Sequence, residues 1–327
     1  MNYMKNRKGT KMRYNTYSEY LKNKYGERVY KIPVNQNLTC PNRDGCLGRG
    51  GCIFCAEEGA AFENLPPEMC IKEQIENNIE YIGKKYKAKK YIIYFQNYSN
   101  TYMPLENFKN MIEQSKHNDV CAVYISTRPD CISDSYMEYL KEFSLGTGYD
   151  ICIELGLQTV NYKTLEIINR KHTLAEFIDA VLTVHKYGFE VCAHLILNLP
   201  WDDMDDVVEC AKIVSALKIK QVKLHSLYIP YNTPLAKMYE NGDFDMGVYQ
   251  DYIDKVITFL RYLSPDIIIQ RIIGRAKESE TAFSNYGVSW WKIKDEIDEI
   301  MEKDNIYQGD KCNYLGGKAL KNMANEK

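Results

Sequence analysis

The chain has 327 residues, of which 45% are apolar and 26% charged, and its formal net charge is −2. This size allows one large α/β domain with appendages or two domains, and the near-neutral charge argues against a broad nucleic-acid surface but not against a local basic patch. No apolar run approaches the ~20 residues of a membrane helix, so we expect no membrane partner. Residues 1–13 carry five basic groups and no acid, without the apolar segment of a secretion signal. Eleven cysteines then fit a reducing compartment, so we expect a cytoplasmic protein.

Apolar and turn-forming residues predict a regular alternation of strands and helices after a basic N-terminal tail. Alternating strands and helices form a parallel sheet with right-handed crossovers, either as an incomplete barrel or as an open doubly wound sheet. Ligands gather at the carboxyl ends of the strands in both. We expect helices at 17–25, from Pro66 onward, and at 105–112, 133–143, 165–168, 174–184 and 203–217, and strands at 29–34, 91–95, 121–126, 151–156, 191–197 and 221–227.

The pattern changes at about Gly242, which divides the chain into three parts. Residues 1–28 form a basic tail and helix, and residues 29–241 form the βα unit, with a cysteine-containing loop at 35–63. Residues 242–327 are expected to be an α+β appendage with a helix at 249–263, a strand at 267–270 and a helix at 290–301.

Three cysteines after the first strand have the spacing C-x11-C-x2-C, formed by Cys40, Cys52 and Cys55. Three cysteinates can hold a [4Fe–4S] cluster and keep its fourth iron open, as chelation of S-adenosylmethionine (SAM) requires. Cys46 lies in the same loop, so a structural zinc site with four cysteine ligands is the alternative. The spacing favours the cluster because the loop contains only one C-x2-C pair.

Polar residues follow or interrupt the later strands, where they can surround a ligand. Glu154 lies inside an apolar strand, where a carboxylate is costly unless it bonds a partner. Ribose hydroxyls are one candidate partner, and a salt bridge to Arg128 or Arg170 is the alternative. The candidate SAM-binding residues are Gln96, Ser126, Arg128, Glu154, Gln158, Arg170 and His172, and the candidate substrate-binding residues are His194, Lys223, His225 and Tyr231.

Several motifs together resemble one known family. The sequence Cys40-Pro41-Asn42-Arg43-Asp44-Gly45, followed by Gly50-Gly51-Cys52-Ile53-Phe54-Cys55, resembles the signature of the YhcC/YtqA-type radical SAM proteins, which are relatives of the catalytic subunit of elongator. The resemblance extends from about Tyr14 to Gly309. Further matching motifs are Tyr94-Phe95-Gln96, Ser126-Thr127-Arg128-Pro129-Asp130, Glu154-Leu155-Gly156-Leu157-Gln158-Thr159, Ile168-Asn169-Arg170 with His172, and Lys223-Leu224-His225.

This resemblance implies a partial (β/α)6 radical SAM barrel with an α+β appendage. By resemblance, Cys40, Cys52 and Cys55 ligate a [4Fe–4S] cluster, and Gln96, Glu154, Gln158 and Arg170 lie around SAM. A low-potential electron donor would reduce the cluster. Because elongator-like enzymes modify C5 of the tRNA wobble uridine, the resemblance also implies a tRNA substrate. Gln270-Arg271 stands where better-known members have His-Arg, near the expected substrate surface.

Two other functions remain open on sequence grounds. A barrel of this kind hosts many chemistries, so a radical SAM enzyme that acts on a small molecule or a protein is one alternative. A zinc-loop RNA-binding module without catalytic activity is the other.

Overall fold

The computed structural model describes residues 9, 12–56, 65–274 and 277–325 of the chain. Within these residues the central sheet has seven strands in the order β1-β2-β3-β4-β5-β6-β8, and every neighbouring pair is parallel. The strands are β1 (Val29–Val34), β2 (Lys90–Phe95), β3 (Val120–Thr127), β4 (Asp150–Gln158), β5 (Glu190–Ile196), β6 (Gln221–His225) and β8 (Ile268–Arg271).

The sheet curls into a partial barrel, as expected. β1 and β8 are its opposite edges, yet Lys31 on β1 donates from Nζ to Gln270 Oε1 on β8 over 2.9 Å. A flat sheet of this width would hold the two edges far apart. The expectation of six strands was one too few, because the strand expected in the appendage pairs with β6 as the seventh.

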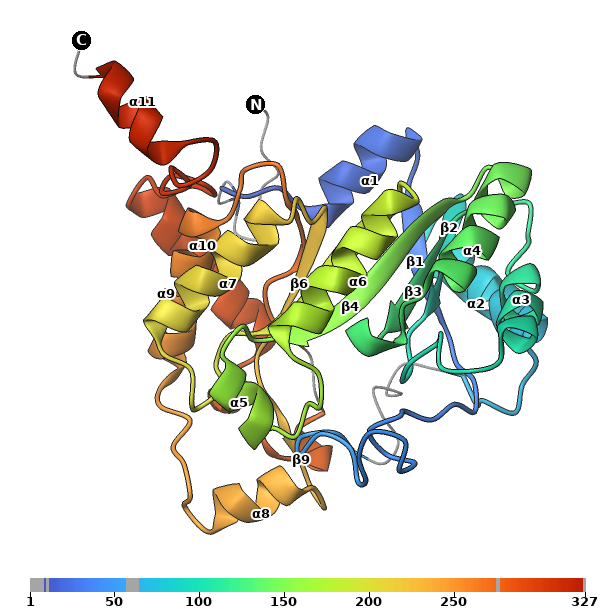
Figure 1. The fold of residues 1–327 in the computed structure, drawn as a ribbon, viewed down its shortest axis with the longest axis horizontal. Helices are drawn as coiled ribbons and strands as arrows, with labels where there is room; N and C mark the ends of the chain where they lie inside the picture. The colour runs from blue at the N-terminus through green and yellow to red at the C-terminus, as the bar shows by residue number, and fades with distance from the viewer. Residues whose placement is uncertain (1–8, 10–11, 57–64, 275–276, 326–327) are drawn as a thin grey trace.

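Helices cover the outer face of the sheet (Figure 1). Apolar side chains from this face and from the helices form one continuous core, which includes Ile93, Ile125, Ile153 and Phe177. These helices are α2 (Ile71–Tyr86), α3 (Leu105–Glu113), α4 (Asp134–Thr147), α6 (Leu174–Lys186), α7 (Met204–Ala216) and α9 (Tyr249–Tyr262), and the short α5 (Tyr162–Ile167) lies between β4 and α6.

The inner face of the barrel carries an apolar cluster nearer the starts of the strands and polar side chains further along them. Side chains alternate along a strand, so Ile153 and Leu155 of β4 join the outer core while Cys152 joins a separate interior cluster with Ile92 and Tyr124. Glu154 therefore faces the interior. This alternation places polar side chains from several strands inside one cavity.

The segment that precedes β1 lies along the free edge of β8. Thr16 forms a parallel bridge with Ile269, and Ile269 N donates to Asn15 O over 2.8 Å. α1 (Tyr17–Tyr25) then contacts both β8 and β1. This helix therefore covers the gap between the two edges of the sheet.

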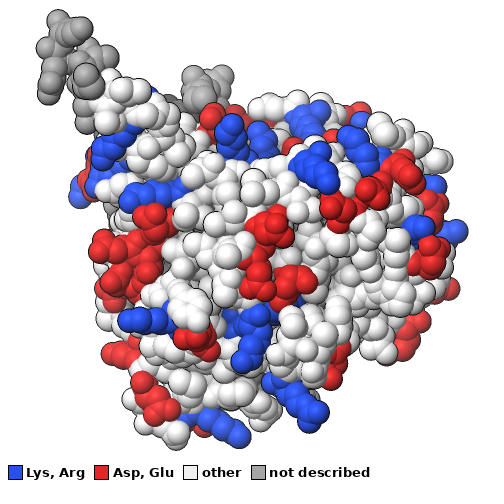
Figure 2. Space-filling view, in the orientation of Figure 1, with Lys and Arg blue, Asp and Glu red and all other residues white. Residues whose placement is uncertain are grey.

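The C-terminal part adds small elements around the cysteine-loop end of the barrel and a helix beside α9 (Figure 1). None of the helices in the described part of the chain is long and apolar enough to cross a membrane. Charged residues of both signs are interspersed on the face shown in Figure 2. The remaining elements of the described residues are β7 (Ile229–Pro230), α8 (Pro234–Glu240), β9 (Thr281–Phe283), α10 (Trp290–Lys303), α11 (Lys318–Asn325) and the short 3₁₀ segments Pro129–Cys131, Glu278–Glu280 and Asn285–Gly287.

Candidate active site

A cavity of about 980 Å³ occupies the barrel interior and reaches the cysteine loop. It brings together most of the residues that the sequence singled out. His172 and Tyr231 do not line it: His172 is buried behind Arg170, and Tyr231 is half exposed beside Glu280. The predicted residues that line the cavity are Cys40, Cys52, Cys55, Gln96, Ser126, Arg128, Glu154, Gln158, Arg170, His194, Lys223 and His225.

Three of the four loop cysteines line the cavity, and the fourth does not. Cys52 is buried and Cys40 and Cys55 are partly exposed, whereas Cys46 is exposed outside the cavity. Burial raises the pKa of the Cys55 thiol, and negative charge on Cys52 and then on Cys40 raises it further. All three of these cysteines line one cavity. Residues 57–63 of the predicted loop lie outside the described residues.

Backbone and amide hydrogen bonds hold the cysteine loop against the loop that follows α5. Asn42 Nδ2 donates to Asn169 O over 2.7 Å, and Asn169 Nδ2 donates to Gly51 O over 2.8 Å. Ile53 N donates to the carbonyl oxygen of Ile168 over 3.2 Å. These contacts cross more than a hundred residues of sequence, so tertiary packing fixes the position of the thiols.

Arg170 joins the thiols to the end of β4. Its Nη1 lies 3.5 Å from Cys52 Sγ, and its Nη2 donates to Gly156 O over 2.8 Å. Its Nε donates to His172 Nε2 over 2.8 Å. Burial, followed by the charges of Arg170 and Arg128, lowers the pKa of His172 to about 2, so the neutral ring accepts this bond. His172 thus positions the guanidinium.

Gly156 is required where it stands because two side chains cross it. A Cβ there would lie 2.7 Å from Arg170 Nη2 and 2.8 Å from Gln158 Nε2. The pairing of β4 with β5 shifts between Gly156 and Gln158, and Gln158 has a φ of 73°. Such a bulge re-aims a side chain beside a site, and here Gln158 lines the cavity.

Two buried donors next to the thiols have no protein partner among the described residues. Arg128 forms a bidentate pair with Asp130 at 2.8 and 2.6 Å, but its buried Nη1 makes no hydrogen bond. Ser99 Oγ is also buried without a partner. Both residues line the cavity. Unpaired buried polar groups are rare in proteins and are typical of places where a ligand supplies the missing partner.

Glu154 is the centre of a buried ionic network. Its Oε1 accepts from Lys31 Nζ at 2.6 Å and Gln270 Nε2 at 3.0 Å, and its Oε2 lies 2.7 Å from His194 Nε2 and 3.2 Å from Lys223 Nζ. Neither Arg128 nor Arg170 is its partner, so the salt bridge considered from sequence goes to lysines instead. A carboxylate has about four acceptor positions, and all are used.

The charges around Glu154 follow from burial and from one another. Although burial by itself raises the pKa of Glu154, Lys223 and then Lys31 hold it well below its usual range. Burial, with help from Lys223, lowers the pKa of His194 to about 4, and burial lowers the pKa of Lys223 to about 8. At neutral pH Glu154 is therefore ionised, His194 is neutral and Lys223 is mostly protonated.

Among the described residues, one group of His, Cys and carboxylate side chains has ligand atoms within 4.8 Å of one another. The group consists of Glu154, Cys192 and His194. Two lysine ammonium groups already contact the same carboxylate. A cation there would be repelled by both lysines, so the geometry does not favour a metal ion at this place.

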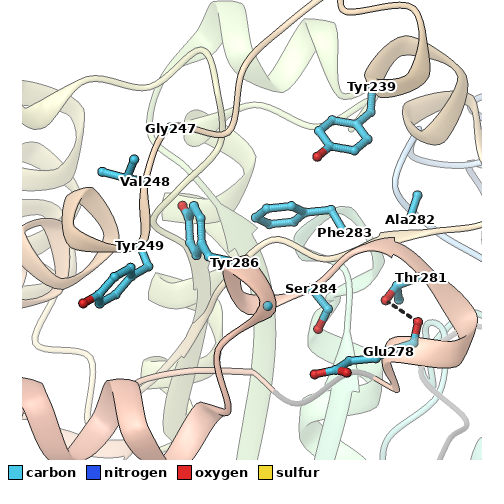
Figure 3. A pocket seen from close by; sticks show the side chains of 11 residues that line it. Tyr239, Gly247, Val248, Tyr249, Glu278, Thr281, Ala282, Phe283, Ser284 and Tyr286 are labelled. Atoms are coloured by element: carbon cyan, nitrogen blue, oxygen red, sulfur yellow. Dashed lines mark hydrogen bonds between the residues drawn. The ribbon is translucent and has the colours of Figure 1, made fainter.

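A smaller cavity of about 580 Å³ lies in the C-terminal part and contains none of the predicted site residues. Figure 3 shows the ring of Phe283 between those of Tyr239 and Tyr286. The Phe283 ring centroid lies 5.9 Å from that of Tyr239 and 5.0 Å from that of Tyr286. These contacts are those of an aromatic cluster that packs the appendage.

Three residues that shape the site were not among the candidate site residues, although Tyr94 and Arg271 lie in motifs that were singled out in the sequence. Lys31, Tyr94 and Arg271 all line the main cavity, and Tyr94 Oη accepts from Lys223 Nζ over 2.8 Å. Lys31 could have been found by the criterion that singled out Glu154, because it too is a charged residue within a predicted strand. Arg271 follows the strand that was assigned to the appendage.

Residues 43–214 of the chain match the Radical SAM superfamily, and residues 219–303 match the Radical_SAM C-terminal domain. The chain therefore belongs to the radical SAM superfamily, whose enzymes use a [4Fe–4S] cluster and SAM. The three thiols in one cavity and the orphaned donors beside them fit these two groups.

Within the superfamily, the chain is similar to proteins of the type that its motifs resemble. It is 37% identical over 301 residues to the uncharacterized protein MJ0486 of Methanocaldococcus jannaschii, covering 90% of each chain. It is 34% identical over 304 residues to the uncharacterized protein YtqA of Bacillus subtilis, covering 92% of this chain and 93% of YtqA. The resemblance to this family is thereby confirmed.

Two more distant similarities involve elongator-type proteins. The tRNA uridine(34) acetyltransferase of Methanocaldococcus jannaschii is 27% identical over 164 residues, which are 49% of this chain and 29% of that protein. The structure of Elp3 from Methanocaldococcus infernus, lacking its N-terminal residues, superposes with a TM-score of 0.63 at 16% identity, covering 86% of this chain and 64% of that one. At this identity the superposition shows a shared fold.

Proposed function

We propose that this radical SAM enzyme modifies the C5 side chain of the wobble uridine in tRNA. The similarity to a tRNA uridine(34) acetyltransferase over 164 residues carries the proposal. Because that match covers 29% of the acetyltransferase, acetyl transfer is not part of the proposed reaction. An anticodon base lies in a single-stranded loop and can be turned into a pocket without melting a duplex. A cavity of about 980 Å³ has room for such a base.

Cys40, Cys52 and Cys55 are the proposed ligands of the cluster. The arrangement in one cavity supports this choice, as does the position of Arg170, whose Nη1 is 3.5 Å from Cys52 Sγ. Cys46 is exposed outside the cavity and has no role in the proposal.

Around the cluster ligands, the residues proposed to bind SAM are polar and line the same cavity. Arg128 keeps a buried donor for a carboxylate, and Arg170 is fixed by His172. Gln96, Ser126 and Gln158 offer further hydrogen-bonding groups. Glu154 instead holds Lys31, Lys223, His194 and Gln270 in place.

When bound, the reduced cluster and SAM supply a 5′-deoxyadenosyl radical that abstracts a substrate hydrogen. The protein's own contribution is to orient the reactants and exclude water. Arg170 and Gln158, whose side chains both lie over Gly156 at the end of β4, are among the residues proposed to orient them.

Two measurements test the proposal separately. Anaerobically reconstituted protein, with dithionite in place of the low-potential electron donor, should release 5′-deoxyadenosine from SAM. Nucleosides of tRNA from cells with and without the gene, compared by mass spectrometry, should then differ at the wobble uridine. Deoxyadenosine release with unchanged wobble uridines would leave a radical SAM enzyme with another substrate, and a colourless protein with one zinc ion would contradict both.

Cysteine variants test the ligand assignment. Cys40→Ala, Cys52→Ala and Cys55→Ala should each lose the iron and the broad absorbance near ~400 nm of a [4Fe–4S] cluster. Cys46→Ala is the matched control in the same loop and should retain both. Loss of iron in Cys46→Ala alone would show that the assignment is wrong.

A further inference from the structure

The interior of the barrel holds more cations than its one carboxylate neutralises. Lys31 and Lys223 both contact Glu154, at 2.6 and 3.2 Å. Arg271 lines the same cavity, and no carboxylate of the described residues lies within ion-pair distance of its guanidinium. Three basic side chains therefore share one acid.

The neighbouring histidines do not change this balance. Burial, followed by the charge of Arg271, holds the pKa of His225 well below its usual range, and the pKa of His194 is lowered to about 4. Both rings are neutral at pH 7, so the group carries two surplus positive charges. Buried charge without a counter-ion is costly, and proteins retain it where a ligand supplies the opposite charge.

Arg271 is held in place but keeps donor capacity. Its Nη2 lies 2.8 Å from His225 Nδ1 and 3.0 Å from Nε2. Its Nε is buried and makes no hydrogen bond within the described part of the chain. The neutral imidazole thus orients the guanidinium without neutralising it.

This cationic group is separate from the arginines near the thiols. Arg128 is already paired with Asp130, and Arg170 is within 3.5 Å of Cys52 Sγ. Arg271 has Tyr94, Tyr228 and Tyr252 as its electrostatic neighbours, together with Glu154. The two arginines that can serve SAM and Arg271 therefore have different contacts within the cavity.

We propose that Arg271, in the positive field of Lys223, forms a subsite for an oxyanion of the substrate, a carboxylate or a phosphate, within the cavity. This inference rests on the proposed function in that the substrate enters this cavity as a nucleotide. A carboxylate would come from a base side chain already extended by an earlier modification, and a phosphate would come from the RNA backbone. Glu154 and Gln270 accept from the ammonium group of Lys31. Glu154 and Tyr94 accept from that of Lys223. Arg271, whose buried Nε has no partner among the described residues, is therefore the residue that contacts the oxyanion.

Isothermal titration of the reconstituted, SAM-loaded protein without reductant tests the subsite. The probes are 5-carboxymethyluridine, its neutral methyl ester, uridine 5′-monophosphate and inorganic phosphate. An anionic nucleoside should bind at least about tenfold more tightly than the ester, because a hydrogen bond between charged groups replaces a neutral contact. Arg271→Gln should remove the preference, and Arg271→Lys should keep part of it. Lys212→Gln removes a partly exposed lysine on α7 that does not line the cavity, and it should leave the preference intact.

The pattern of binding distinguishes the outcomes. A preference for 5-carboxymethyluridine assigns the anion to the base, and a preference for uridine 5′-monophosphate assigns it to the backbone. Equal binding of all three nucleosides would overturn the subsite but keep a nucleotide substrate. Arg271-dependent binding of inorganic phosphate alone would keep the subsite and contradict the RNA substrate. Loss of SAM binding in Arg271→Gln would show that the arginine serves SAM, which also overturns the inference.

Discussion

Glu154→Gln should destabilise the protein strongly, because it leaves two lysines without their counter-ion. The side chain of Glu154 is completely buried, and those of Lys31 and Lys223 are 16% and 10% exposed. Removing one partner of a buried pair typically costs about 3–5 kcal/mol in the free energy of unfolding. Glutamine preserves the volume and can still accept from Lys31, so we expect the lower part of this range, about 3 kcal/mol.

Thermal denaturation of the reconstituted protein measures this effect. At roughly 2–4 °C per kcal/mol, the midpoint should fall by about 6–12 °C. Glu80→Gln is the matched control, since Glu80 pairs with Lys84 on the solvent-exposed face of α2, and its midpoint should not change measurably.

A double variant tests the physical reason. When Lys31→Met is added to Glu154→Gln, one of the stranded charges disappears, and the midpoint should recover part of the loss. Strictly additive losses, or a shift below about 2 °C in Glu154→Gln alone, would show that the network does not stabilise the barrel in this way.

Three further predictions follow from the same contacts. Gly156→Ala should displace Arg170 and weaken SAM binding about tenfold in equilibrium titration. Gly146→Ala in α4 is the control, because nothing lies within 4 Å of a Cβ there, and it should bind SAM normally. Equal affinities of the two variants would contradict the close approach at β4. Asn42→Ala should speed cluster loss on exposure to a chelator, because the amide that donates to the neighbouring loop is gone, and an unchanged rate would argue against this anchor. The pKa of Glu154 is lower in the folded than in the unfolded protein, so its stabilisation is present above pH ~4.3 and is lost as the pH falls toward the folded pKa. The stability difference between wild type and Glu154→Gln should therefore narrow below about pH 4 in acid denaturation, and a difference that grows on acidification would contradict the assigned charge.

The order of helices and strands was accessible from sequence because it depends on local periodicity. The strands expected at 29–34 and 91–95 and the helix expected at 17–25 appear as β1, β2 and α1. Likewise, the capping box of Thr173 and Glu176 at the start of α6 involves residues three apart. The short β7, α8 and β9 were not predicted: β7 and β9 have only two and three residues, too few to show a period, and α8 has seven residues, less than two full turns.

The chemistry of the cysteine motif was also encoded locally, as a spacing of three thiols in a glycine-rich loop. By contrast, the partners of Glu154 come from β1, β5, β6 and β8, strands that are distant in sequence and meet only because the sheet curls. Sequence could show that a carboxylate inside a strand needs a partner, but not which one. The closure of the barrel, which brings Lys31 to Gln270, decided that choice and left Arg271 as the cation without an acid.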